Sequence, residues 1–119
     1  MTKIGIGITT HNRYDVFSKT LAEIKRLAPA GAEIVVVDDA SDKPVPEATY
    51  RYARNVGIAA AKNKCFELLE GCDHIFLFDD DTYPLVQDWH QLYVASHEPH
   101  LMYIFQDFAT GTKLNDTIK

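Results

Sequence analysis

The sequence predicts an α/β domain in which a mostly parallel sheet is sandwiched between helices. Apolar, strand-like runs alternate along the chain with segments of helical spacing, which is typical of parallel sheets. Three of the apolar runs also end in clusters of polar side chains. With 119 residues, 46% of them hydrophobic and 24% charged, the chain can bury one compact core, so we expect residues 1–119 to form a single domain.

The N-terminal part of the chain predicts a strand, a loop and a helix. Residues 4–9 (IGIGIT) are apolar or small throughout, which favours a buried strand. Asn12 is placed to cap the following helix, which should end before Pro29. The helical spacing rests on Phe17, Leu21, Ile24 and Ala28.

The middle of the chain repeats this order. Residues 33–37 (EIVVV) predict a second strand, which stops at the turn-rich segment DDASDKPVPE. Residues 50–52 predict a short third strand. Residues 58–69 are rich in alanine and predict a helix packed closely on the sheet, with Gly71 as its stop signal.

The remaining elements are a fourth strand, a helix and a fifth strand. We assign these to residues 74–78 (HIFLF), 86–96 and 101–105 (LMYIF), respectively. The last residues, ATGTKLNDTIK, predict a turn and an irregular tail.

Charge and composition exclude several classes of protein. The formal net charge of -5 disfavours a non-specific nucleic-acid binder, which normally carries a basic face. The sequence has no signal peptide and no apolar run of membrane-spanning length, so we expect a soluble, cytoplasmic protein. Cys65 and Cys72 lie seven residues apart in a helix-like segment, where they would not face each other, so we expect reduced, structural thiols.

Polar clusters follow three of the predicted strands at the point where each strand ends. They are TTHNR after the first strand, DDASD after the second and DDDT after the fourth. In open α/β sheets, ligands bind beyond the carboxyl ends of the strands, so we expect the clusters to meet around a ligand. The repulsion within the triplet of carboxylates favours a cation, and hard oxygen ligands suit Mg or Mn. The alternatives are a solvated acidic turn for DDD and an Asx-turn for DDAS.

Four stretches taken together are similar to a known family. ITTHNR, EIVVVDDASD, RNVGIAAAKN and IFLFDDDTYP, in this order, resemble the nucleotide-sugar-binding half of family 2 glycosyltransferases, which have the Rossmann-like GT-A fold. The resemblance covers roughly residues 3–105. It implies a nucleoside-diphosphate-sugar donor, often a uridine one, and a divalent metal, Mn or Mg, held by the aspartate cluster.

The resemblance also implies roles for the acidic clusters. Asp79 and Asp81 form its D-x-D pair at the metal, with Asp81 as the ligand, while Asp80 and less directly Asp79 reach the ribose or the water shell of the metal. Asp39 corresponds to the carboxylate that accepts a hydrogen bond from the imide of the base, and Asp38 to its neighbour at the ribose.

Other donor-binding positions carry over from the first and third stretches. Thr9 and His11 correspond to residues that line the base, His11 standing where the family more often has tyrosine. Arg13 belongs to the same cluster.

Gly57 and Lys62 correspond to the turn and cation near the diphosphate. Lys62 stands where the family commonly has arginine, so the charge is kept and the bidentate fork is lost. Arg54 could supply a second cation, and a purely structural helix start is the alternative for this segment.

The resemblance leaves the catalytic residue unknown. Inverting members need a general base that deprotonates the acceptor hydroxyl, and it normally lies well after the D-x-D pair. Only 38 residues follow Asp81, so we expect the acceptor half to be absent or truncated. Glu98 and Asp107 are the remaining carboxylates that could serve as the base, and neither is assigned that role.

Three readings of the short chain stay open. It is a piece of a longer enzyme, a minimal enzyme completed by a partner or by a second copy in a homo-oligomer, or a donor-binding module without turnover. The acceptor, whether saccharide, lipid, protein or nucleic-acid base, cannot be read from the sequence.

Two other families also carry aspartates at strand ends. A metal-dependent phosphatase of the haloacid dehalogenase type usually carries its D-x-D on the first strand and a Thr or Val where this chain has Tyr83. A response-regulator receiver expects its acidic pair after the first strand, where this chain has TTHNR. The order of the strands disfavours both families.

Overall fold

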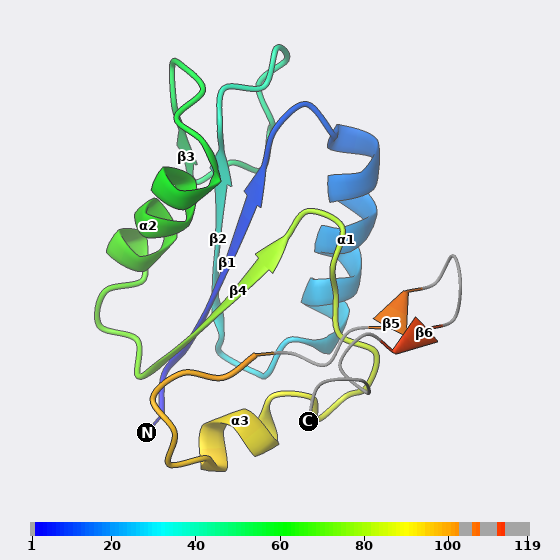
Figure 1. Ribbon diagram of the computed structural model, residues 1–119, viewed down its shortest axis with the longest axis vertical. Helices are drawn as coiled ribbons and strands as arrows, with labels where there is room; N and C mark the ends of the chain where they lie inside the picture. Colours follow the sequence, from blue (N-terminus) through cyan, green and yellow to red (C-terminus); the bar gives the residue numbers. More distant parts are fainter. Residues whose placement is uncertain (1, 103–105, 108–111, 114–119) are drawn as a thin grey trace.

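A computed structural model describes residues 2–102, 106–107 and 112–113. Its centre is a four-stranded, all-parallel sheet in the order β3-β2-β1-β4 (Figure 1). The strands are β1 (Ile4–Thr10), β2 (Glu33–Asp38), β3 (Tyr50–Arg51) and β4 (His74–Asp79). Two further short strands, β5 (Gln106–Asp107) and β6 (Thr112–Lys113), form a separate antiparallel pair. The predicted α/β class with a parallel sheet is confirmed.

The register of the sheet brings three polar clusters to one edge. Thr9 of β1 lies opposite Val37 of β2 on one side and opposite Asp79 of β4 on the other. Thr10 lies opposite Asp38. Because all three strands run in the same direction, their carboxyl ends and the loops that follow them converge there.

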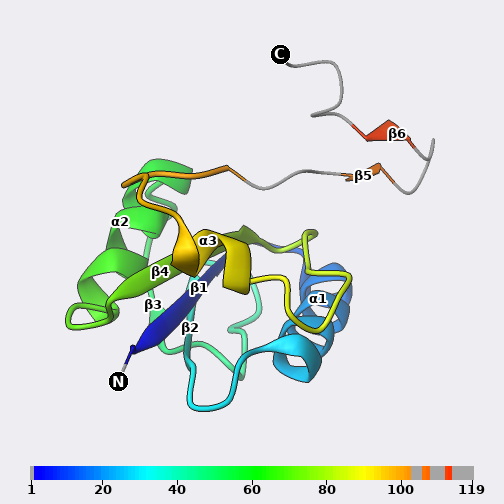
Figure 2. The ribbon, with the colours of Figure 1, turned by 90° about the horizontal axis from the view of Figure 1, so that it is seen from below.

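Helices cover both faces of the sheet. α1 (Tyr14–Leu27) lies on one face and α2 (Ile58–Leu68) on the other, as the view in Figure 2 shows. Each helix closes its own apolar cluster against the sheet. The cluster on the α1 side contains Ile6, Ile8, Phe17, Leu21, Ile24, Val36, Val45, Phe76 and Phe78. The cluster on the α2 side contains Val35, Val37, Ala61, Cys65 and Leu69.

The predicted cap of α1 is wrong. Asn12 has a left-handed backbone (φ 54°), and the residue before the helix is Arg13. The amide oxygen of Asn12 accepts a hydrogen bond from the backbone N–H of Asp42 (2.7 Å), so it joins two loops and is not available to the first turn of the helix.

The predicted helix over residues 86–96 is shorter than expected. α3 spans only Gln91–Ala95, and turns precede it. In those turns Trp89 packs edge-on against Phe76 and Phe78, and its indole N–H donates to the Leu27 carbonyl at the end of α1 (2.9 Å). These contacts hold the partly buried indole in a turn where the first helical turns were predicted.

The predicted strand over residues 101–105 is not found where the structure describes it. Leu101 and Met102 are exposed and belong to no strand. Residues 103–105 lie outside the described residues.

Two glycines of β1 let α2 approach the sheet closely. A β-carbon built on Gly7 would lie 2.7 Å from the β-carbon of Cys65, and one built on Gly5 would lie 2.9 Å from both Leu69 and the Cys72 sulfur. At Gly7 the contact is with a β-carbon of α2, so this position admits only glycine at the present helix–sheet separation, whereas a side chain at Gly5 would require Leu69 and Cys72 to move.

Both cysteines are free. Cys65 is fully buried between α2 and β1, and this burial raises the pKa of its thiol to about 11. Burial also raises the pKa of Cys72. Packing against glycine explains both residues, as expected for structural thiols. In the part of the chain that the structure describes, no helix is long and apolar enough to cross a membrane.

We predict that Gly7→Ala destabilises the fold by about 1–3 kcal/mol, the usual cost of forcing an extra methyl group into a packed core. Urea unfolding followed by circular dichroism measures the change. Ala59→Ser on the exposed face of α2 is a matched small substitution and should shift the free energy of unfolding by less than about 0.5 kcal/mol. Equal stability of Gly7→Ala and the unaltered protein would contradict the close contact.

Candidate functional site

A pocket of about 380 Å³ lies at the carboxyl ends of β1, β2 and β4. The loops that follow these strands and the start of α2 form its walls. It is lined by Thr9, Thr10, His11, Arg13, Asp39, Asn55, Gly57, Ile58, Ala61, Asp79, Asp80 and Asp81. The three clusters that follow the strands in the sequence therefore do meet around one cavity.

The carboxylates of the acidic triplet are each paired with a cation from another part of the chain. Lys62 of α2 contacts Asp79 (2.8 Å). Arg13, which precedes α1, contacts Asp80 (3.0 Å) and Asp81 (3.5 Å). These contacts offset the repulsion that the run of three aspartates creates.

The three aspartates differ in their surroundings. Asp80 is buried, and its second oxygen accepts a hydrogen bond from the Thr10 hydroxyl (2.9 Å). The side chains of Asp79 and Asp81 are about half exposed, at 51% and 49%. Asp80 thus ties β4 to β1, whereas Asp79 and Asp81 present oxygens to the pocket.

Lys62 is held on three sides. Its ammonium group contacts Asp79, donates to the Thr9 hydroxyl (3.0 Å) and donates to the Phe78 carbonyl (3.2 Å). An ammonium group has three donors, so these contacts use its capacity fully. The residue fixes the start of α2 against the ends of β1 and β4.

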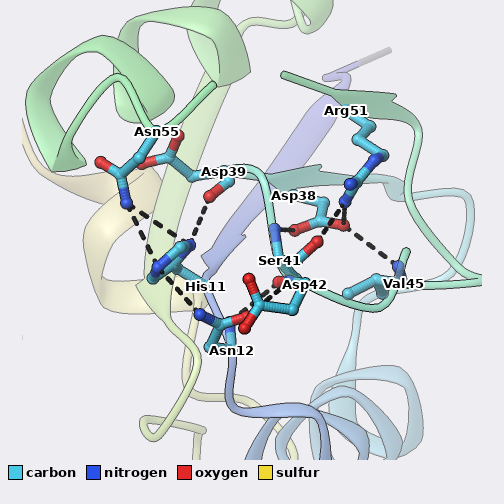
Figure 3. Close-up of polar contacts among 9 residues, drawn as sticks. All are labelled: His11, Asn12, Asp38, Asp39, Ser41, Asp42, Val45, Arg51 and Asn55. Atoms are coloured by element: carbon cyan, nitrogen blue, oxygen red, sulfur yellow. Dashed lines mark hydrogen bonds and ion pairs between the residues drawn. The ribbon is translucent and has the colours of Figure 1, made fainter. Parts of the chain in front are cut away.

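His11 is fixed by contacts to both ring nitrogens (Figure 3). Its Nδ1 lies against the carbonyl oxygen of Asp39, which can only accept a hydrogen bond, so Nδ1 carries the proton. Nε2 lies 3.2 Å from the side-chain amide nitrogens of both Asn12 and Asn55. These contacts hold the imidazole in one orientation at the wall of the pocket.

Asp39 positions the turn that leads into α2. Its two carboxylate oxygens accept hydrogen bonds from the backbone N–H groups of Val56 (2.7 Å) and Gly57 (3.0 Å). Gly57 has a φ of 89°, which favours glycine, and its N–H also contacts the side-chain oxygen of Asn55 (3.1 Å). The sequence N-V-G thus forms a tight turn closed by the neighbouring loop.

Asp38 lies outside the pocket lining. Its carboxylate is fully buried and accepts hydrogen bonds from Arg51 (2.8 Å) and from the backbone N–H groups of Ser41 (3.0 Å) and Val45 (3.1 Å), as Figure 3 shows. Burial acts to raise the pKa of this carboxyl, but the hydrogen bonds from Ser41, Val45 and Arg51 outweigh it and lower the pKa below 3.8. This aspartate organises the loop after β2.

The structure brings most of the predicted site residues together. Of the ten named in the sequence analysis, Asp38 and Lys62 are absent from the pocket lining, and Lys62 still reaches it through Asp79. Arg54, named there as a possible second cation, does not line the pocket either. Pocket residues that were missed are Thr10, Asn55, Ile58 and Ala61.

Two of the four missed residues could have been found from the sequence. Thr10 stands inside the cluster TTHNR, and Asn55 belongs to the N-x-G turn. Ile58 and Ala61 carry no polar group, so only the packing of α2 beside the strand ends places them at the pocket.

Comparison with known families decides what this arrangement belongs to. The sequence model of the family described as Glycosyl transferase family 2 matches residues 6–116, which includes every residue of the pocket. The chain belongs to glycosyl transferase family 2. No individual curated protein gives a significant match. The glycosyltransferase domain thus has the parallel sheet and the strand-end pocket that its sequence predicted.

The carboxylates in the pocket of this glycosyltransferase form only part of a binding site for a divalent cation. Asp79 and Asp81 offer hard, half-exposed oxygens. Within the described residues, however, no three His, Cys, Asp or Glu side chains are grouped so that they would hold a metal ion alone. Mg and similar ions commonly use one or two carboxylates together with substrate phosphates, and the pocket suits that mode of binding.

We predict that Asp38→Asn destabilises the domain by about 3 kcal/mol at pH 7, because the amide group would oppose the donors that now face the carboxylate. The folded pKa of Asp38 lies below its unfolded value of about 3.8, so its contribution is complete well above pH 3.8 and is lost as the pH falls through the folded pKa. Urea unfolding at several pH values from 7 to 3 should therefore show the gap between the two proteins narrowing below pH 3.8.

Asp42→Asn is the matched control for that experiment. Asp42 is the exposed neighbour of the same loop, and its substitution should change stability by less than about 0.5 kcal/mol at every pH. A gap for Asp38→Asn that stays constant down to pH 3 would mean that the charge of Asp38 does not stabilise the fold.

Proposed function

We propose that this glycosyltransferase domain binds a nucleoside-diphosphate sugar, UDP-linked, in the strand-end pocket together with Mn or Mg, and transfers the sugar to an acceptor hydroxyl with inversion. The observation that carries the proposal is the balance of charge at the pocket. Four carboxylates line it, from Asp39 and from the triplet Asp79, Asp80 and Asp81, whereas among the described residues Arg13 and Lys62 are the cations that form ion pairs with them.

This balance bears directly on the ligand. An excess of two negative charges would repel a bare diphosphate at short range. A divalent cation bound to the half-exposed oxygens of Asp79 and Asp81 would cancel that excess and leave coordination positions for phosphate oxygens. When bound, such an ion stabilises the charge that develops on the diphosphate leaving group.

The remaining pocket residues suit the other parts of the donor. Three polar contacts hold His11 in one orientation at the wall, and we place the base against its ring face. Thr9, which lies on β1, lines the same pocket. Each carboxylate oxygen of Asp39 accepts one hydrogen bond from the turn at Gly57. The second lone pair of each oxygen can accept a hydrogen bond from the imide N–H of a uracil base. Gly57 lines the side of the pocket on which we place the diphosphate, and Lys62 reaches that side through its contact with Asp79. Asp38, buried and turned to Arg51, is left out of the proposed donor contacts.

The chemistry assigned to the chain's own residues is binding and orientation. In an inverting transfer the acceptor oxygen forms its bond to the anomeric carbon as the bond to the diphosphate breaks, and the hydroxyl proton passes to a general base. None of the pocket carboxylates is assigned that role: Asp39 and Asp80 are held by internal contacts, and Asp79 and Asp81 are assigned to the metal.

The test is a calorimetric titration of UDP into the protein with and without Mn, followed by the same titrations with GDP. We expect UDP to bind only when Mn is present, and GDP to bind more weakly. Asp81→Ala should weaken Mn-dependent UDP binding on the order of 10- to 100-fold, because a charged ligand to the ion is removed. Glu70→Ala, an exposed carboxylate at the end of α2, is the control and should bind as the unaltered protein does.

Three outcomes separate the alternatives. Full Mn-dependent binding by Asp81→Ala would contradict the metal assignment. Binding of UDP and UDP-sugars without release of UDP in the presence of acceptors would identify a donor-binding module without turnover. Absence of binding for both nucleotides under every metal condition would reject the proposal, and phosphatase assays would then be the next step.

A further inference from the structure

The most exposed ion pair of the pocket joins Arg13 and Asp81. The two groups are 3.5 Å apart, and their side chains are 48% and 49% exposed. The other contact of the same guanidinium, to Asp80 at 3.0 Å, reaches a carboxylate that is only 8% exposed and also bonded to Thr10. Pairs between exposed charges are weak because water competes for both groups, so the contact to Asp81 is the easier of the two to break.

Lys62 is less free to change partners than Arg13. Its side chain is 21% exposed, and all three of its donors are used within the protein. The guanidinium of Arg13 has five N–H groups and a planar fork that can bind a phosphate with two of them at once. Arg13 also lines the pocket, so a ligand anion there is within its reach.

We propose that Arg13 is an internal counterion that competes with the divalent metal for Asp81 and transfers its contact to the diphosphate when metal and nucleotide bind together. This inference rests on the proposed function. Arg13 keeps its contact to the buried Asp80 as a hinge, releases Asp81 to the cation, and turns its free N–H groups toward the phosphate oxygens.

Arg13 is therefore a positioning residue that couples two binding events. A metal ion that binds without nucleotide must displace the guanidinium of Arg13 from Asp81, and the displaced guanidinium then finds no new anion. Metal with nucleotide gives the displaced guanidinium a new partner, so each ligand strengthens the binding of the other by the same factor. Without Arg13, metal should bind more readily alone and gain less from the nucleotide.

Electron paramagnetic resonance of free Mn tests this coupling without any measurement of activity. Mn is titrated into the protein with and without saturating UDP. For Arg13→Gln we expect the affinity for Mn alone to rise on the order of 3- to 10-fold, and the enhancement of Mn affinity by UDP to shrink by at least a similar factor. Arg26→Gln removes the same charge from an exposed pair at the other end of α1 and should change neither quantity.

A second variant guards against loss of the fold, because Arg13 also pairs with the buried Asp80. Arg13→Lys keeps one cation for Asp80 but cannot bridge two carboxylates with a planar fork, so its values should lie between those of the unaltered protein and Arg13→Gln. Thermal unfolding identifies any variant that fails to fold. If Arg13→Gln does not fold, the Mn affinities of Arg13→Lys and the unaltered protein are compared instead.

The failures of the two proposals are distinguishable. Mn-dependent UDP binding in the unaltered protein, with Mn affinity unchanged or lowered in both Arg13 variants, would overturn the role of Arg13 and leave the proposed function standing. Absence of Mn binding in every protein, with and without UDP, would overturn both.

Discussion

The contact between α2 and the two glycines of β1 is the constraint on which the rest of the site depends. Gly5 and Gly7 bring the helix so close to the sheet that Cys65 and Leu69 occupy the space where side chains of β1 would lie. At that distance Lys62 reaches both Thr9 on β1 and the end of β4. Tight packing in the middle of the helix thus sets the position of a cation at the edge of the sheet.

Buried carboxylates organise the loops around the pocket. Asp38 closes the segment after β2 through backbone N–H groups and Arg51, and Asp39 closes the turn before α2 through two more. Asp38 is the last residue of β2 and Asp39 follows it, yet the two carboxylates hold different loops. The aspartates at the strand ends therefore divide into those that shape the loops of the pocket and those, Asp79 and Asp81, that remain partly exposed in it.

The alternation of strands and helices along the chain, the parallel sheet and the meeting of three polar clusters could be predicted because apolar periodicity and strand ends are local patterns. The partners of the charged residues could not. Arg13 and Asp80 are far apart in the sequence, and only the register of β1 against β4 brings them together. Asparagine is typical of a helix cap, but the side-chain oxygen of Asn12 accepts a hydrogen bond from a backbone N–H 30 positions away instead. The helix before Gln91 was overestimated because the packing of Trp89 against Phe76 and Phe78 outweighed local propensity.

The burial of Cys65 makes its thiol a probe for the local separation of α2 from the sheet. A thiol reacts as the thiolate, and a pKa of about 11 leaves very little of that form near neutral pH while the side chain stays enclosed. Alkylation of Cys65 thus requires α2 to separate from β1, and its rate follows the free energy of that local opening. Because Lys62 lies on the same helix, the modification rate of one sulfur atom would record how often the cationic side of the pocket comes apart.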